Sequence, residues 1–371
     1  MSKKVLLTAT VQSHICQFHK PLMKLLQENG YEVHVAARNN LAEKNGLKID
    51  FADKVFDVPF ERSPLSPKNL KAYKEVKKII DNGDYDFVHT NTPAAGVFTR
   101  LAAQKARKKG TCVIYTAHGF HFYDGAPKKN WMIYYPIEKF CARLTDKLIT
   151  ITEEDYALAS ENFKTNVYHI HGVGANSSKF YALCEEEKKT IREELCIPED
   201  TKVIVNVGEL LPNKNQRTAI LAMKKVVEKY PTAKLFIAGN GPELDNLTNL
   251  VKENGLGNSV EFLGYTLELN KYNNIAECSV ACSFREGLPL NVMEAMLCEN
   301  AVVASNNRGH RELVKDGVTG FIVGATDVDA FADRIIKVLD NPTIYAKSAL
   351  EKAQLFTDKN VYKELGNIYF G

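Results

Sequence analysis

Residues 283–296 read Ser-Phe-Arg-Glu-Gly-Leu-Pro-Leu-Asn-Val-Met-Glu-Ala-Met. The apolar run that leads into this stretch predicts a buried strand, and Gly-Leu-Pro predicts a turn from that strand into a helix. We expect Pro289 at the first helical position, where its missing N–H costs nothing. The free amides of Leu290 and Asn291 would then form an anion site at the helix end.

Two carboxylates, Glu286 and Glu294, flank this predicted anion site. Glu294 lies one turn into the helix, and helical side chains lean toward the N-terminus, so its carboxylate could reach past the anion to a ribose. Glu286 would lie on the other side of the site, near a second sugar. Two glutamates alone are more often exposed surface residues. A phosphate site between two carboxylates, however, suits a nucleotide sugar.

Short β-rich runs alternate with amphipathic helices along the whole chain, which predicts parallel sheets with helices on both faces. The expected strands are 4–11, 32–37, 54–58, 87–90, 112–117, 147–151, 167–170, 202–207, 234–238, 260–263, 280–283, 302–305 and 320–323. The expected helices include 18–29, 68–81, 94–109, 154–162, 216–229 and 244–253. The small, polar residues 172–178 predict a hinge. The sequence therefore predicts an α/β chain of two Rossmann-like, doubly wound domains.

The composition is that of a globular protein large enough for two domains, with 371 residues, 45% of them hydrophobic and 25% charged. A net charge of only +3 gives no support for nucleic-acid binding. We expect no segment that spans a membrane and no signal peptide. The eight cysteines are scattered and lack zinc-site spacing, which favours reduced thiols in the cytoplasm and no metal site.

Several polar residues follow predicted strands, where ligands of open α/β sheets bind. Lys214 starts a helix soon after Gly208, and it could meet a diphosphate as a mobile point charge, although a solvated lysine is commoner there. In the first half, Ser13 and His14 follow the first strand. His118 and His121 follow the strand 112–117, where a single histidine is more often structural.

The spacing from Glu286 to Glu294, with Glu-Gly at one end and Glu-Ala-Met at the other, resembles the signature of the retaining glycosyltransferases of the family-four, group 1 type. This resemblance implies the GT-B architecture, in which two Rossmann-like domains face a cleft. It implies an acceptor-binding domain over residues 1–175 and a nucleotide-sugar-binding domain over 176–355. The last helix, 356–371, would cross back onto the first domain.

The resemblance also implies roles for individual residues. Lys214 would bind the phosphates, Glu286 a sugar hydroxyl and Glu294 the ribose, while His118 would align the sugar and the acceptor. The remaining expected donor contacts are Gly208, Tyr265, Gly287, Leu288, Leu290 and Asn291. Two departures are visible, since Glu209 stands where many members have arginine, and a Gly-Gly loop after the first strand is missing. Ser13 and His14 would take over part of that loop's role at the acceptor side, and His121 would form a wall of the site.

The implied reaction is transfer of a hexose or N-acetylhexosamine, with retention, from a UDP-linked sugar nucleotide to a lipid-linked saccharide during exopolysaccharide or capsule assembly. The resemblance implies no cofactor and no required metal. Residues 126–140 combine lysines with aromatic residues, which suits a peripheral contact with the inner face of a bacterial membrane as well as it suits an aromatic core.

Two other functions remain open. A sugar-nucleotide 2-epimerase shares the architecture but keeps its product soluble, and it depends on further acidic residues that the sequence does not reveal. A non-catalytic partner subunit would bind nucleotide sugar without turnover, which Glu209 and the missing Gly-Gly loop would fit. A dehydrogenase is disfavoured because no Gly-x-Gly-x-x-Gly follows the first strand.

Overall fold

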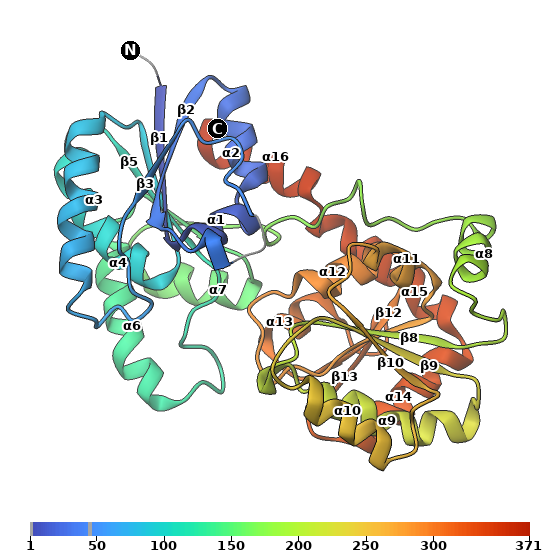
Figure 1. Ribbon diagram of the computed structural model, residues 1–371. Coiled ribbons are helices and arrows are strands. Elements are labelled where there is room, and N and C mark those ends of the chain that lie inside the picture. Colours follow the sequence, from blue (N-terminus) through green and yellow to red (C-terminus); the bar gives the residue numbers. More distant parts are fainter. Residues whose placement is uncertain (1–2, 44–46) are drawn as a thin grey trace. The chain divides into compact units, whose positions relative to one another are not determined.

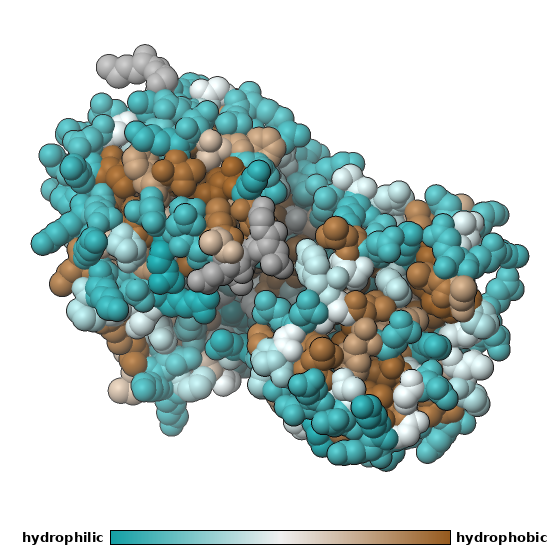
Figure 2. Space-filling view, viewed as in Figure 1, coloured by the Kyte–Doolittle hydropathy of each residue, from teal (hydrophilic) through white to brown (hydrophobic). Residues whose placement is uncertain are grey.

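The computed structural model describes residues 3–43 and 47–371, which form two compact units (Figure 1). Unit 1 comprises Met1–Gly174 together with Lys359–Gly371, and unit 2 comprises Ala175–Asp358. Each unit is a parallel sheet covered by helices, which confirms the expected pair of doubly wound domains. The face drawn in Figure 2 is largely hydrophilic, with patches of apolar residues between the hydrophilic ones.

Unit 1 contains a seven-stranded parallel sheet in the order β3-β2-β1-β4-β5-β6-β7. Its strands are β1 (Lys3–Val11), β2 (Tyr31–Arg38), β3 (Lys54–Asp57), β4 (Phe87–Asn91), β5 (Cys112–Ala117), β6 (Lys147–Thr150) and β7 (Asn166–His169). The central strands β1, β4 and β5 are buried on both faces because helices cover both, although β4 carries the polar residues His89, Thr90 and Asn91. The direction in which strands are added reverses between β1 and β4, and such a switch point is where ligands of these sheets bind.

The helices of unit 1 are α1 (Gln12–Phe18), α2 (Lys20–Glu28), α3 (Asn69–Gly83), α4 (Pro93–Ala102), α5 (Gln104–Arg107), α6 (Lys128–Ala142), α7 (Glu153–Asn162) and α16 (Asp358–Phe370). The helix expected over 18–29 is found as α2, whereas the separate helix α1, which ends just before a break at His19 with ψ near 7°, was not expected. The helix expected over 94–109 is divided at Ala103.

The last helix, α16, completes unit 1 although unit 2 precedes it in the chain. The Tyr369 hydroxyl lies 2.5 Å from Nδ1 of the buried His89 on β4. Glu364 Oε1 lies 2.6 Å from Nδ1 of His171, and Lys147 donates a hydrogen bond to the carbonyl of Ile368. These contacts join the end of the chain to the centre of the first sheet.

Unit 2 contains a six-stranded parallel sheet in the order β10-β9-β8-β11-β12-β13, whose switch point lies between β8 and β11. Its strands are β8 (Val203–Val207), β9 (Lys234–Ala238), β10 (Val260–Gly264), β11 (Cys278–Ala281), β12 (Ala301–Ser305) and β13 (Gly320–Val323). Its helices are α8 (Glu185–Glu194), α9 (Gln216–Lys229), α10 (Leu244–Glu253), α11 (Leu269–Ile275), α12 (Leu290–Leu297), α13 (Arg308–Leu313), α14 (Val328–Asp340) and α15 (Pro342–Ala353). Across the described residues, none of the helices is both long and apolar enough to cross a membrane.

Candidate active site

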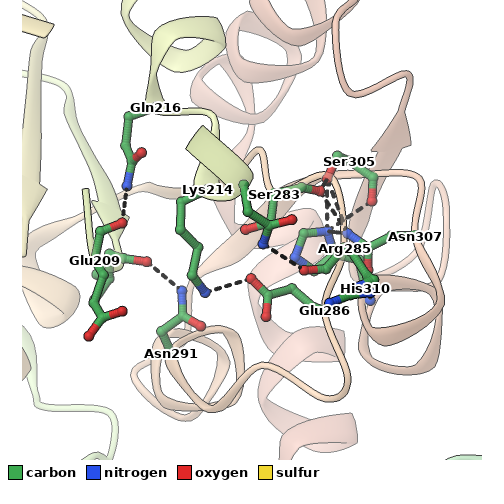
Figure 3. Close-up of polar contacts among 12 residues, drawn as sticks. Glu209, Lys214, Gln216, Ser283, Arg285, Glu286, Asn291, Ser305, Asn307 and His310 are labelled. Atoms are coloured by element: carbon green, nitrogen blue, oxygen red, sulfur yellow. Dashed lines mark hydrogen bonds and ion pairs between the residues drawn. The ribbon is translucent and has the colours of Figure 1, made fainter. Parts of the chain in front are cut away.

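Lys214 and Glu286 meet at the switch point of unit 2. Lys214 ends a short 3₁₀ turn after β8, and Glu286 lies in the loop after β11. Lys214 Nζ is 2.6 Å from Glu286 Oε1, and the two side chains are only 24% and 15% exposed (Figure 3). The sequence predicted both residues for the same site. It did not reveal that they form an ion pair with each other.

Hydrogen bonds hold the two loops that carry this ion pair. The Phe284 amide donates to the Asn213 carbonyl at 2.8 Å, and the Asn213 side chain donates to the Arg285 carbonyl at 3.0 Å. Asn215, in the left-handed region at φ 53°, donates from its side chain to the Cys282 carbonyl at 3.2 Å. Lys214 and Glu286 therefore project from loops that are fixed to each other before any ligand binds.

Glycines let the loops of unit 2 pack backbone to backbone. A Cβ on Gly239, which follows β9 with φ +142°, would lie 1.9 Å from the Gly208 carbonyl oxygen. A Cβ on Gly309 would lie 2.6 Å from the Gly287 carbonyl oxygen. Gly208 and Gly287 are both predicted donor contacts. The backbone of each lies so close to a neighbouring residue, Gly239 and Gly309 respectively, that only glycine fits at that neighbouring position.

We expect Gly239→Ala to destabilise unit 2 by roughly 2–4 kcal/mol, because it adds backbone strain and a clash with the Gly208 carbonyl. Gly255→Ala is the matched control, because Gly255 also has a positive φ, +67°, but its added Cβ would meet nothing within 4 Å. Urea unfolding of both variants measures the difference. Equal losses of stability would show that the close approach of Gly239 does not matter.

Helix α12 begins at Leu290, so Pro289 is its N-cap residue and does not occupy the first helical position as expected. The reason is that the backbone of Pro289 is extended, with ψ 115°. Its carbonyl accepts a hydrogen bond from the Val292 amide at 3.2 Å. Leu290 and Asn291 are then the first two helical residues, whose amides have no acceptor within the helix. The Asn291 side chain donates to the Val207 carbonyl at 2.7 Å, which fixes α12 against the end of β8.

Glu294 is the fifth of the eight residues of α12 and is largely buried. Burial raises the pKa of its carboxyl to about 7, and the positive charge of Lys179 only partly opposes this effect. The group therefore changes its charge close to neutral pH. Desolvated carboxyl groups of this kind are frequent at ligand sites.

His310, in α13, is a buried residue near the ion pair for which the sequence gave no clear role. Its Nδ1 donates to the Ser305 carbonyl at 2.9 Å, and its Nε2 is buried without a hydrogen-bond partner among the described residues. Burial is the main cause that lowers the pKa of His310, while the nearby Glu286 opposes it and Lys214 adds to it. Figure 3 shows His310 beside Glu286 and Arg285.

The remaining predicted donor contacts differ in their surroundings. Tyr265 follows β10 and is 71% exposed, so its ring is accessible at the edge of the sheet. Leu288 packs against the apolar cluster under α12. Glu209 is exposed, and its carbonyl accepts from the Gln216 side chain at 3.1 Å.

In unit 1, the structure brings together two of the predicted acceptor-side residues. His14 on α1 and His118 after β5 have ring centroids 4.8 Å apart. Ser13 is fixed beside them, since its hydroxyl accepts from the Asn40 side chain at 2.9 Å. His121 has different neighbours, because its ring lies 4.6 Å from that of Tyr134 in α6.

A third histidine, His19, joins this group, and the sequence analysis missed it. Its ring centroid is 5.2 Å from that of His14 and 5.4 Å from that of His118. Burial lowers the pKa of His14 to about 4, and it lowers the pKa of His19 and His118 well below the usual value. The three imidazoles are therefore neutral at pH 7, and each can accept or donate a hydrogen bond.

Comparisons with known proteins agree with this arrangement. The model of the family "Glycosyl transferases group 1" matches residues 187–355, and that of "Glycosyl transferase 4-like" matches residues 4–152. EpsD of Bacillus subtilis (strain 168) is 41% identical over 374 residues, covering 100% of this chain and 97% of that protein. The UDP-Gal:alpha-D-GlcNAc-diphosphoundecaprenol alpha-1,3-galactosyltransferase of Escherichia coli is 26% identical over 340 residues, covering 89% of this chain and 87% of that protein.

Among solved structures, HepE of Anabaena in complex with UDP-glucose matches with a TM-score of 0.71 and 18% identity, covering 98% of each chain. At that identity the match concerns the fold, which is the GT-B architecture. Together with the full-length similarity to EpsD, these findings show that the chain belongs to the group 1 glycosyltransferases and is a glycosyltransferase.

Proposed function

We propose that this glycosyltransferase moves a hexose or N-acetylhexosamine from a UDP-sugar to a lipid-linked saccharide with retention of anomeric configuration, during exopolysaccharide or capsule assembly. The observation that carries the proposal is the Lys214–Glu286 ion pair at the switch point of unit 2. The E. coli relative is named for a UDP-Gal donor and a diphosphoundecaprenol-linked acceptor, and HepE was solved with UDP-glucose. Both names support a UDP-sugar donor.

Binding of the donor would exchange the partners of the ion pair. A diphosphate at the start of α12 attracts the Lys214 ammonium, which then leaves Glu286 free to accept a hydrogen bond from a sugar hydroxyl. During the reaction, negative charge grows on the departing diphosphate. Lys214 and the amides of Leu290 and Asn291 stabilise that charge, because they are already oriented before the reaction begins.

Retention follows when the acceptor attacks from the face that the diphosphate leaves. The departing phosphate oxygen then takes the acceptor's proton, so no side chain has to act as the base. His118 aligns the sugar and the acceptor hydroxyl as a neutral hydrogen-bonding group, consistent with the lowered pKa that burial gives it. Ser13 and His14 contact the acceptor from the first turn of α1. No cofactor or metal is required for these steps.

The donor is identified by measuring UDP release from a panel of UDP-sugars, with purified protein and a membrane extract from a polysaccharide-producing bacterium. We expect acceptor-dependent release from one sugar, and a loss of roughly 10- to 100-fold in Glu286→Ala, because a charged hydrogen-bond acceptor is removed. Glu253→Ala, at the exposed end of α10, is the control and should keep its rate. Binding without turnover would instead favour a partner subunit, and a new soluble sugar formed without acceptor would favour an epimerase.

A lipid-linked acceptor requires contact with the membrane surface, and α6 offers an apolar face in unit 1. Met132 and Phe140 on this helix are 77% and 53% exposed, with Lys129 and Lys139 on the same helix. A groove of about 380 Å³ is lined by Pro64, Val97, Leu101, Pro136, Ile137, Phe140 and Cys141. Exposed apolar residues beside lysines suit an anionic membrane surface at the cytoplasmic face.

We expect Phe140→Glu to reduce sedimentation with phosphatidylglycerol vesicles several-fold, because it places a charge where an apolar ring would enter the lipid. Ile344→Glu is the control. Ile344 lies on α15 of unit 2 and is 62% exposed, so this variant adds the same charge at a different place on the surface. Equal losses in the two variants would assign the effect to net charge and contradict a role for α6.

A further inference from the structure

His14, His19 and His118 form a compact group of metal-ligating side chains in unit 1. One ring nitrogen from each lies within 4.8 Å of the corresponding nitrogens of the other two. The group comes from two separate places in the chain, because His14 is the third residue of α1, His19 follows the end of that helix, and His118 follows β5. The edge of His118 meets the other rings nearly perpendicularly, with interplanar angles of 89° to His14 and 78° to His19.

The Nε2 atoms of all three histidines are buried and have no hydrogen-bond partner in the part of the chain that the structure describes. Buried polar atoms are normally satisfied, so an unpaired nitrogen on each of three rings this close together indicates a ligand that the rings share. The neighbouring His89 shows the contrast. It is also buried, but its Nδ1 contacts the Tyr369 hydroxyl at 2.5 Å and its Nε2 the Thr116 hydroxyl at 2.7 Å.

We propose that unit 1 binds one divalent transition-metal ion of the Zn²⁺ type through His14, His19 and His118. Imidazole nitrogen is a preferred ligand of such ions, whereas Mg²⁺ and Ca²⁺ prefer oxygen, and the group contains no carboxylate. Zinc–nitrogen bonds of about 2.0–2.1 Å place tetrahedral ligands roughly 3.3 Å apart, so the rings have to close slightly around the ion.

Three protein ligands leave one tetrahedral position open. A cavity of about 20 Å³, lined by His19, His118, His89 and Thr116 among others, lies at the group. That volume suits a single water molecule as the fourth ligand. The site is therefore of the open kind, which exchanges its fourth ligand and can release its ion.

The bound ion would hold the His118 ring that otherwise aligns the sugar and the acceptor. Zinc at this site therefore inhibits transfer, and this consequence, unlike the binding itself, rests on the proposed function. The site would give the enzyme a sensitivity to divalent transition metals although its chemistry needs none.

Binding is tested on the metal-stripped full-length protein without any substrate. Titration with Co²⁺ should give the visible absorption of a tetrahedral nitrogen-ligated ion, and Zn²⁺ should abolish that absorption at one equivalent per chain. All eight cysteines are free thiols, and Cys184 and Cys196 are exposed. These two exposed cysteines are replaced by serine so that they cannot bind the metal adventitiously. Absence of a saturable, one-equivalent site in this protein would overturn the proposal.

His14→Gln and His19→Gln should each weaken Co²⁺ binding at least about 100-fold, since a direct ligand is lost. His171→Gln is the matched control, because His171 is a partly exposed histidine of the same unit that pairs with Glu364. Thermal unfolding checks that each variant is folded, and Zn²⁺ should raise the midpoint of the wild type and of His171→Gln only. Equal affinity in all variants would assign the ion to another place and overturn the proposal.

The inhibition is tested separately by UDP release in the presence of Zn²⁺. The wild type should lose activity in the concentration range in which it binds the ion. His19→Gln should show no inhibition relative to its own metal-free rate. If Zn²⁺ binds to the three histidines but does not inhibit, the metal site stands and the role of His118 in transfer is wrong.

Discussion

Replacing Lys214 with alanine is expected to slow sugar transfer by roughly 100- to 1,000-fold, the effect of removing one preorganised donor that faces a developing negative charge. Lys214 is the cation at the switch point of unit 2, and it lies next to the loop that leads into α12. The loss should appear mainly in kcat, because the charge on the diphosphate grows most in the transition state. UDP release under saturating donor measures it.

The variant also removes the partner of Glu286, so a general loss of stability has to be separated from the loss of catalysis. Lys225→Ala is the control. Lys225 lies on the exposed side of α9 and forms an ion pair of the same length, 2.6 Å, with Asp333 of α14. Exposed pairs contribute little to stability, and this variant should retain its rate. A Lys214→Ala enzyme with unchanged kcat would contradict the leaving-group role.

Glu294→Gln is expected to weaken donor binding and to stabilise the protein at alkaline pH at the same time. The folded state raises the pKa of this carboxyl from 4.5 to about 7, so the native protein binds the proton more tightly than the unfolded chain does. The contribution of this carboxyl to the free energy of unfolding is fully present below pH 4.5 and is lost as the pH rises through about 7. The shift corresponds to at most about 3 kcal/mol, which glutamine would restore at pH 8.

Donor binding should respond in the opposite direction. The ionised carboxylate accepts hydrogen bonds from the ribose hydroxyls more strongly than the neutral acid, so affinity for UDP should rise as the pH increases through about 7. Glutamine should lower the affinity at pH 8 roughly tenfold and remove its pH dependence. Melting temperatures and UDP titrations between pH 5 and pH 8 measure the two effects, with Glu253→Gln as the control. A variant whose stability and UDP affinity follow those of the wild type across this range would show that Glu294 neither titrates there nor contacts the ribose.

Local patterns were sufficient to predict the two sheets, because apolar runs and their spacing depend on residues close in sequence. Placing Lys214 and Glu286 in one site depended on the family resemblance, because local patterns alone favour exposed residues at both positions. The ion pair between them was not predictable, because the loops are fixed by backbone bonds such as that from Phe284 to Asn213. His310 was missed for a similar reason, as its burial depends on how α13 packs.

The group of three histidines illustrates the same limit. On one continuous helix, residues five apart such as His14 and His19 would point in directions about 140° apart. The break between α1 and α2 lies at His19 and changes that relation, so both rings meet His118. No capping residue marks the start of α1, whose N-cap Val11 has no side-chain hydrogen bond to the helix. The sequence therefore indicated neither α1 nor the break between α1 and α2.

The position of α16 has a consequence for synthesis of the protein on the ribosome. Its residues Tyr369 and Glu364 complete unit 1, but they are made only after all of unit 2. Unit 2 is continuous in sequence and can reach its final structure first. Meanwhile the nascent unit 1 leaves His89 and the ring of Phe87 on β4 without their contact to Tyr369, and transiently exposed surface of this kind is prone to aggregation.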